Sequence, residues 1–228
     1  MKILTVHYNT PLLVEMLVRS VRKYTDCDVY VFDNSDKMPF KKRMDGVHVI
    51  DNTEGQVFDF QRELERYPNR KPGLFSSFGS AMHTMSVDAC FDILTDGFIL
   101  MDSDILLKKD FTWIWDESKV WVGEIKNDGP EACYVERLLP FLCYINVPMC
   151  KANGIRYFNG EYMWNLTMVE PNRWYDTGAW LLRESLDRGL PHKDFVVEEY
   201  VEHFSHGSHE FLNIDAYDWL IENKSLWS

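Results

Sequence analysis

Two aspartates lie one residue apart, directly after an apolar run. Residues 98–101 predict a buried strand, and Asp102 and Asp104 follow it. Residues two apart on an extended chain point the same way, so both carboxylates face one region. Two like charges this close favour a bound cation, and oxygen ligands suit Mg²⁺ or Mn²⁺. The spacing therefore indicates a metal-bound, phosphorylated substrate, with a solvated turn as the alternative interpretation.

Composition and charge narrow the class of protein. The chain has 228 residues, of which 46% are hydrophobic and 14% aromatic, so we expect one folded domain with a sizeable core. The formal net charge of −12 excludes a nucleic-acid partner, because phosphate backbones need a basic surface. The same charge opposes a pyrophosphate substrate unless a divalent cation offsets it.

Cysteine usage and the chain start indicate the compartment. The five cysteines are odd in number and show no CxxC pair, so we expect reduced, mostly buried thiols. The first residues become polar too soon for a signal peptide, and no apolar run is long enough to span a membrane. These features predict a cytoplasmic protein without an integral membrane segment.

Strands and helices alternate in the first half of the sequence. Thr10 and Pro11 are typical of a helix start, and the apolar spacing that follows is helical. The predicted strands are 2–7, 28–32, 47–50 and 98–101, and the predicted helices begin at residues 10 and 78. This alternation indicates an α/β domain with a mostly parallel sheet and helices on both faces. We expect a long loop over 54–76 and irregular structure over 116–170.

The order of these elements resembles the GT-A fold of nucleotide-diphospho-sugar transferases, and its motifs are similar to those of family 2 glycosyltransferases. The matching segments end successive strands: Tyr8-Asn9, Asp33-Asn34-Ser35 without the usual glycine, Asn52 to Gly55, and Asp102-Ser103-Asp104. The resemblance covers residues 1–110 well and the remainder poorly. It implies a Rossmann-like single domain, with a nucleotide-sugar-binding half over 1–110 and an acceptor and catalytic half over 111–228.

The resemblance also implies roles for individual residues. Tyr8 would border the nucleobase and Asp33 would accept a hydrogen bond from it. Asp102 would contact the ribose or share the metal ion, and Asp104 would hold the Mn²⁺ or Mg²⁺ on the donor diphosphate. Two alternatives stay open: Tyr8 as an aromatic residue at a strand end, and Asp33 as a turn-forming residue.

The second half must supply the general base and any late metal ligand. Asp176 precedes a predicted helix and is the candidate base, with a helix N-cap as its alternative role. The Glu-Asp pair usual in family 2 enzymes is absent. His203, His206 and His209 recur at a spacing of three, and His206, before Gly207-Ser208, fits best as a metal ligand. A polar loop that happens to be rich in histidine is the alternative.

These observations predict a metal-dependent glycosyltransferase. Its donor would be a UDP-, TDP- or GDP-sugar, its acceptor a carbohydrate or a lipid-linked hydroxyl, and family 2 resemblance implies inversion at the anomeric carbon. A non-catalytic sugar-nucleotide-binding domain of the same fold stays open. A phosphatase of the haloacid-dehalogenase type fits less well, because its DxD lies on the first strand. A nucleotidyltransferase would need a glycine-rich basic loop after the first strand, and none is present.

Overall fold

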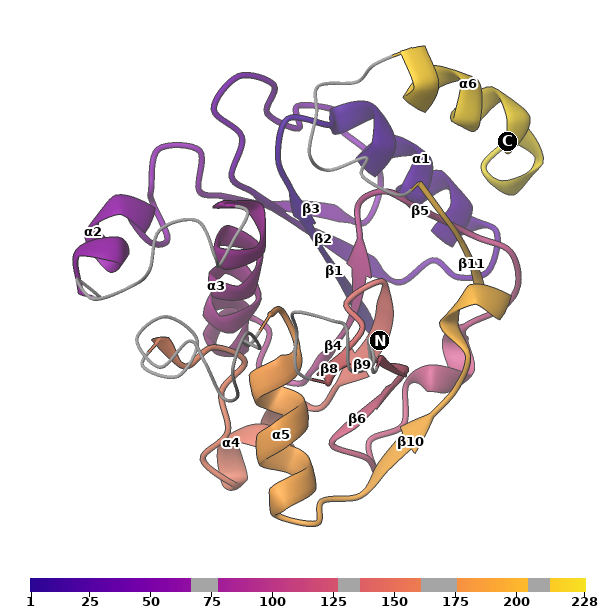
Figure 1. The fold of residues 1–228 in the computed structure, drawn as a ribbon. Helices are drawn as coiled ribbons and strands as arrows, with labels where there is room; N and C mark the ends of the chain where they lie inside the picture. Colours follow the sequence, from indigo (N-terminus) through magenta and orange to yellow (C-terminus); the bar gives the residue numbers. More distant parts are fainter. Residues whose placement is uncertain (67–77, 127–135, 161–175, 205–213) are drawn as a thin grey trace.

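A mixed seven-stranded sheet forms the centre of the molecule (Figure 1). The computed structural model describes residues 1–66, 78–126, 136–160, 176–204 and 214–228. From one edge to the other, the strands are β10 (His192–Asp194), β6 (Trp121–Gly123), β9 (Leu142–Ile145), β4 (Phe98–Asp102), β1 (Lys2–His7), β2 (Asp28–Asp33) and β3 (Val47–Asp51).

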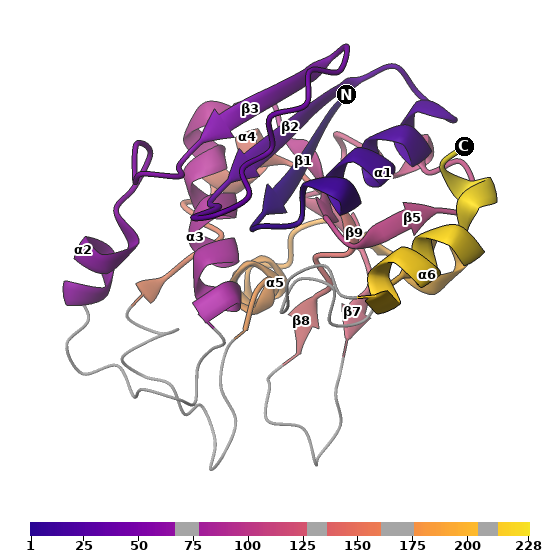
Figure 2. The same cartoon turned by 90° about the horizontal axis from the view of Figure 1, so that it is seen from above.

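Strands β4, β1, β2 and β3 are parallel, as the sequence predicts. Their carboxyl ends therefore meet at one edge of the sheet, and Figure 2 shows β1, β2 and β3 pointing in one direction. Strand β9 is antiparallel to both β4 and β6. The expectation of irregular structure over 116–170 is therefore wrong for β6, β9 and α4 (Val147–Ala152). These elements are short, and β9 is buried on both faces, so it lacks the alternation that marks a strand.

Helices cover both faces of the sheet, as expected for this class. Helix α1 (Pro11–Arg22) packs on the face that carries Ile3 and Ile99. Helices α3 (Phe78–Ile93), α4 and α5 (Ala179–Asp187) pack on the face that carries Leu4 and Leu100. Neighbouring strand residues point to opposite faces, so each parallel strand contributes to two apolar cores. Burial on both sides fixes the register of the central strands and the position of their carboxyl ends.

Smaller elements surround this centre. Helix α6 (Ile214–Glu222) lies beside α1 (Figure 1), where Leu220 packs with Leu13. The remaining elements are the helix α2 (Phe60–Glu65), the antiparallel pair β5 (Ile105–Leu107) and β11 (Val201–His203), the hairpin β7 (Ile125–Lys126) and β8 (Arg137–Leu138), and 3-10 turns at Thr112–Ile114, Val197–Glu199 and Lys224–Leu226.

Two other expectations can be compared with the structure. Cys90, Cys143 and Cys150 are buried free thiols and Cys27 is half-buried, whereas Cys133 lies outside the described residues. Among the described helices, none has both the length and the apolar character that crossing a membrane requires.

Candidate active site

The two aspartates of the DxD segment lie at the carboxyl end of β4, in the turn to β5. The Asp102 side chain is 20% exposed, whereas Asp104 is buried. Burial and the neighbouring charge of Asp102 raise the pKa of Asp104 above its usual value, although contact with His203 acts in the opposite direction. The parallel register pairs Asp102 with Val6, so the segment lies beside the end of β1. The two carboxylates thus lie close enough for their charges to repel each other, and the region around them is called the DxD site below.

Strand β11 brings a histidine to this turn. It pairs with β5 in antiparallel register, so that His203 lies opposite Ile105, and the Phe204 N–H donates to the Asp104 carbonyl at 2.9 Å. The His203 Nε2 atom lies 3.5 Å from Asp104 Oδ1, and the Phe141 ring packs on the imidazole. Burial alone would lower the pKa of His203, but its contact with Asp104 and the charge of Asp102 outweigh burial and raise it. His206, the ligand favoured by sequence, lies outside the described residues with His209.

Helix α3 contributes a second histidine. His83 Nε2 lies 3.2 Å from Asp102 Oδ1, yet this buried nitrogen makes no hydrogen bond to any described residue. Its Nδ1 atom is 3.1 Å from the Thr177 hydroxyl, which is 3.1 Å from the Tyr157 hydroxyl. The two contacts hold the imidazole with Nε2 turned toward the DxD segment. His83 therefore turns a nitrogen without a hydrogen bond toward the Asp102 carboxylate, and such an unsatisfied buried group is a candidate contact for a ligand.

The residues of the DxD site fit a divalent cation. Asp102 and Asp104 supply hard carboxylate oxygens, and the His83 nitrogen beside them makes no hydrogen bond to a described residue. Within the ranges that the structure describes, no group of three or more His, Cys, Asp or Glu side chains is arranged to hold a metal alone. A cation here therefore needs further ligands, such as phosphate oxygens or water.

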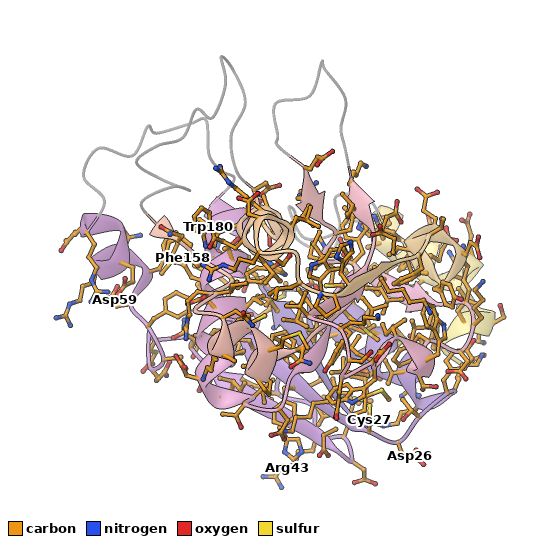
Figure 3. All side chains as sticks on the ribbon, turned by 90° about the horizontal axis from the view of Figure 1, so that it is seen from below. Asp26, Cys27, Arg43, Asp59, Phe158 and Trp180 are labelled. Carbon is orange, nitrogen blue, oxygen red and sulfur yellow. The ribbon has the colours of Figure 1, made fainter. Side chains whose placement is uncertain are left out.

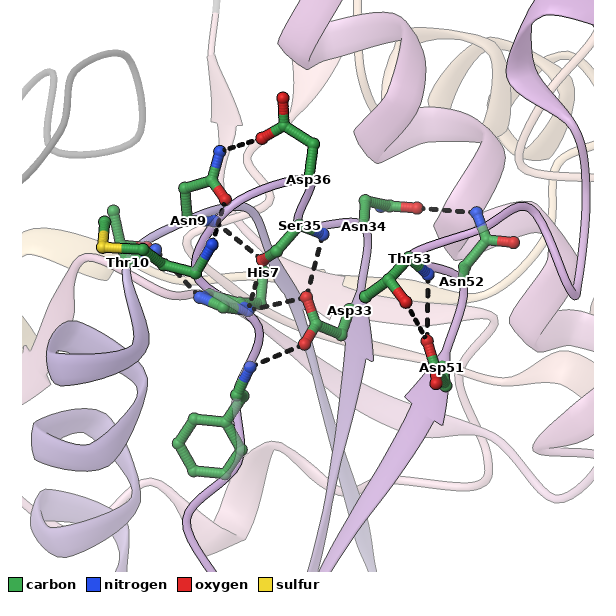
Figure 4. Close-up of polar contacts among 12 residues, drawn as sticks. His7, Asn9, Thr10, Asp33, Asn34, Ser35, Asp36, Asp51, Asn52 and Thr53 are labelled. Carbon is green, nitrogen blue, oxygen red and sulfur yellow. Dashed lines mark hydrogen bonds and ion pairs between the residues drawn. The ribbon is translucent and has the colours of Figure 1, made fainter.

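A second polar cluster lies at the carboxyl ends of β1, β2 and β3 (Figure 4). Asp33 Oδ1 accepts from Ser35 N at 2.9 Å and contacts His7 Nδ1 at 3.0 Å, while Oδ2 accepts from Phe40 N at 2.7 Å. His7 Nε2 accepts from Thr10 N at 2.9 Å, so Nδ1 carries the proton and donates to Asp33. The structure thus shows the turn-forming role for Asp33. A nucleobase that donates a hydrogen bond to Asp33 would have to share these oxygens with the groups that already donate to them.

The pKa of Asp33 reflects these contacts. Burial alone would raise it, but the hydrogen bonds from His7 and Ser35 outweigh burial and hold the pKa below its usual value. Further along the edge, Asn52 Nδ2 donates to Asn34 Oδ1, and Asn34 Nδ2 donates to the Ser86 hydroxyl, each at 2.8 Å. The loops after β2 and β3 are therefore bound to each other and to α3.

Tyr8 differs from this cluster in its exposure. It follows β1 and is 37% exposed, and partial burial together with the charge of Asp36 raises its pKa. The next residue, Asn9, has a left-handed backbone (φ 57°), with its carboxamide bonded to Asp36 and to the N–H groups of Lys37 and Met38. The turn thus leaves the Tyr8 ring partly open to solvent.

The segment 176–178 lies between β8 and α5. Arg137 Nη1 donates to Asp176 Oδ2, and both side chains are mostly buried. Gly178 has φ 79° and occupies the N-cap of α5, so the N-cap alternative for Asp176 is wrong. A Cβ on Gly178 would lie 2.1 Å from the Leu138 carbonyl oxygen, so only glycine allows this approach. Strand β8 therefore fixes both the charge partner of Asp176 and the start of α5.

Comparison with solved structures identifies the fold. No known family model and no curated protein matches the sequence. The galactosyltransferase LgtC, solved with donor and acceptor sugar analogs, matches with a TM-score of 0.52 at 11% identity, over 86% of this chain and 74% of LgtC. The chain has a GT-A-like glycosyltransferase fold. The glycosyltransferase GlyE of Streptococcus pneumoniae TIGR4 matches with a TM-score of 0.49 at 13% identity, over 87% of this chain and 45% of GlyE.

The sequence favours His206 over His203 as a late metal ligand, because the pairing of β11 with β5 depends on a register that the short segment 201–203 does not reveal. Two other residues of this region, Arg137 and Tyr157, are missed by sequence reasoning. Arg137 contacts Asp176, which lies 39 positions further along the chain, and Tyr157 contacts Thr177, which lies 20 positions further along. Only the tertiary fold creates these contacts, so no local pattern could have found them.

Proposed function

We propose that this protein is a metal-dependent glycosyltransferase that moves a sugar from a nucleoside-diphosphate donor to an acceptor hydroxyl. The observation that carries the proposal is the DxD segment at the carboxyl end of β4. There Asp102 and Asp104 lie together, and a His83 nitrogen without a hydrogen bond lies 3.2 Å from Asp102 Oδ1. The carboxyl edge of parallel strands is where α/β proteins bind nucleotides. The GT-A-like fold agrees with this assignment.

Asp102 and Asp104 would hold Mn²⁺ or Mg²⁺, with His203 and His206 as candidate late ligands. When bound, the cation would neutralise charge that develops on the leaving diphosphate. His83 is placed to donate a hydrogen bond to a donor oxygen, since its Nε2 lies 3.2 Å from Asp102 Oδ1 and makes no hydrogen bond to a described residue. Tyr8 would border the nucleobase from the neighbouring strand end. A bound cation would also offset the repulsion between a diphosphate and the two aspartates, in a chain whose net charge is −12.

Asp176 is the proposed general base that takes the acceptor proton. Arg137 Nη1 donates to Asp176 Oδ2, so this contact must open before that oxygen can reach an acceptor hydroxyl. If the activated hydroxyl attacks the anomeric carbon directly, from the side opposite the leaving diphosphate, the configuration at that carbon is inverted. Asp176→Asn should lower transfer by at least about 100-fold and leave donor affinity nearly unchanged. Transfer near the wild-type rate would leave Asp176 as the partner of Arg137 only.

Release of nucleoside diphosphate from UDP-, TDP- and GDP-sugars tests the proposed activity. Each donor is offered with a panel of sugar and lipid-linked acceptors, with Mn²⁺, with Mg²⁺ or with EDTA. We expect turnover of at least one donor, and only with a divalent cation. Metal-independent turnover would contradict the metal assignment, and absence of turnover despite donor binding would contradict the enzyme assignment.

The Arg137–Asp176 ion pair favours a second candidate function, that of a non-catalytic sugar-nucleotide-binding domain. In that case the pair serves only to fix β8 against α5, and no base is needed. The two candidates differ in Arg137→Met, which frees the Asp176 carboxylate. If Arg137→Met changes the pH dependence of sugar transfer, the result supports the enzyme. If wild type and Arg137→Met both bind the donor but neither transfers the sugar, the result supports the binding domain.

A further inference from the structure

A basic groove lies away from the DxD site. It encloses about 560 Å³ and is lined by Arg19, Arg22, Lys23, Lys42, Arg43 and Trp227, among others. Helix α1 runs back along the parallel strands, so its last turns lie near the amino ends of β2 and β3, opposite the carboxyl edge. Figure 3 shows Arg43 at the other end of the molecule from Trp180 of α5, which is close to the candidate active site. The groove is therefore separate from that site.

The charge of the groove contrasts with the charge of the chain. Five cationic side chains line it, while the whole chain has a formal net charge of −12. Asp45 adds a side-chain carboxylate to the lining, the last residue Ser228 lines it as well, and Glu15 lies beside it. Cations near the end of a helix offset its dipole, which accounts for Arg19 and Arg22. That explanation does not extend to Lys42 and Arg43, which come from the connection between β2 and β3.

The five cations are not all committed to the fold. Arg22 donates to the carbonyls of Cys27 and Asp45 at 2.7 and 2.9 Å, so it shapes the floor of the groove. Arg19 and Lys42 both bind Glu15 Oε1, which leaves an excess positive charge. Arg43 is exposed and has no polar partner in the part of the chain that the structure describes. The groove thus holds cationic donors that a ligand can use.

An aromatic wall completes the groove. The Trp227 indole N–H donates to the Leu220 carbonyl at 2.9 Å, which fixes the ring at the edge of the cationic surface. Lys23 donates to the Ser225 carbonyl and fixes the same segment against α1. A planar, partly apolar wall beside Arg and Lys donors suits a ligand whose anionic group is attached to an apolar or ring-shaped body.

We propose that this groove is an anion-binding site for a phosphate-bearing ligand, independent of the nucleotide-sugar site. Arg43 and Lys42 contact the phosphate, Arg19 adds charge, and Trp227 covers the group attached to the phosphate. Guanidinium forks and lysine ammonium groups are the side chains that bind phosphate oxygens most strongly. A soluble phosphate ester and the headgroup of an anionic phospholipid present this same chemistry.

Calorimetry with inorganic pyrophosphate in EDTA tests the free ligand, because EDTA keeps the metal-dependent site silent. Sedimentation with phosphatidylcholine vesicles, with or without phosphatidic acid, tests the headgroup. We expect saturable binding of at least one probe, weakened by added salt and at least about tenfold weaker in Arg43→Ala. Pyrophosphate binding alone identifies a soluble ligand, and binding only to the anionic vesicles identifies a headgroup.

Two matched variants make the test specific. Lys41→Ala removes an exposed cation next to the groove but outside its lining, so it should leave binding unchanged. Asp104→Asn disables the proposed metal site and should also leave binding unchanged. The proposal is overturned if neither probe binds the wild-type protein. It is equally overturned if Lys42→Ala/Arg43→Ala binds like wild type, or if Lys41→Ala weakens binding as much as Arg43→Ala.

Discussion

Two polar clusters lie at the same edge of the sheet and differ in how well their hydrogen-bonding groups are satisfied. At the ends of β1 and β2, both oxygens of Asp33 and both ring nitrogens of His7 have partners within the chain. At the end of β4, Asp104 is buried beside a like charge and His83 keeps an orphaned nitrogen. In the first cluster the Thr10 hydroxyl has no partner among the described residues, but the Asp33 carboxylate is fully bonded; in the second, Asp104 lies beside the like charge of Asp102.

This difference separates scaffold from site among residues of similar type. A buried aspartate that accepts from two backbone N–H groups stabilises a turn, and its removal leaves several donors unsatisfied. A buried aspartate next to another carboxylate costs stability that a bound cation would recover. Opposite responses to the same Asp→Asn change are therefore expected at the two places, and the following variants test the contrast.

The largest effect on stability is expected at Asp33. Asp33→Asn replaces one acceptor oxygen by an N–H₂ donor that faces Ser35 N–H, His7 Nδ1–H or Phe40 N–H. We expect the free energy of unfolding in urea to fall by about 3 kcal/mol. Asp51→Asn is the matched control, because Asp51 ends β3 and is exposed. Among the described residues, its side chain forms hydrogen bonds only with Thr53 (Figure 4), so the change should cost about 0.5 kcal/mol. Equal losses would remove the contrast.

A smaller effect is expected at Gly178, where the scaffold meets the segment that carries Asp176 and Thr177. Gly178→Ala places a Cβ 2.1 Å from the Leu138 carbonyl oxygen at φ 79°. We expect a loss of about 2 kcal/mol in thermal or urea unfolding.

Gly189→Ala serves as its control, because Gly189 has φ 63° but nothing within 4 Å of the added Cβ. It should cost about 1 kcal/mol from backbone conformation alone. If both variants lose the same stability, the close approach of Gly178 to β8 does not constrain the site.

The smallest stability effect is expected at Asp104. Burial and the charge of Asp102 both raise the pKa of this carboxyl, so replacing it by a neutral amide removes an unfavourable charge. We expect Asp104→Asn to unfold at the same urea concentration as wild type or a higher one, with any loss below about 0.5 kcal/mol. A loss as large as that of Asp33→Asn would mean that Asp104 is scaffold.

The sequence predicted most of the first half of the fold because long elements there carry strong patterns. The Thr10-Pro11 start, the stripe of Leu13, Leu17 and Val21, and helix α3 appear where they were expected. The second half resisted prediction because β6, β9 and β10 have only three or four residues each. Such short segments take their structure from the neighbouring strand, and not from local preference.

The sequence predicted those residues of the candidate site that directly follow a strand. Asp102 and Asp104 follow an apolar run, so their place at the edge of the sheet follows from the sequence. Which late histidine approaches them depends on the register of β11 against β5, which brings His203 within 3.5 Å of Asp104. The internal role of Asp33 likewise depends on Phe40, whose N–H reaches it only after the chain turns back.

Calorimetry of nucleoside diphosphate binding tests most directly whether the end of β4 is the active site. UDP, TDP and GDP are titrated into wild type and into Asp104→Asn, each with Mn²⁺ and with EDTA. We predict that Mn²⁺ strengthens the binding of at least one nucleotide to wild type and has no such effect on the folded variant, while any binding in EDTA, as the basic groove would give, is the same in both proteins. Undiminished Mn²⁺-dependent binding by Asp104→Asn, at unchanged stability, would contradict the assignment.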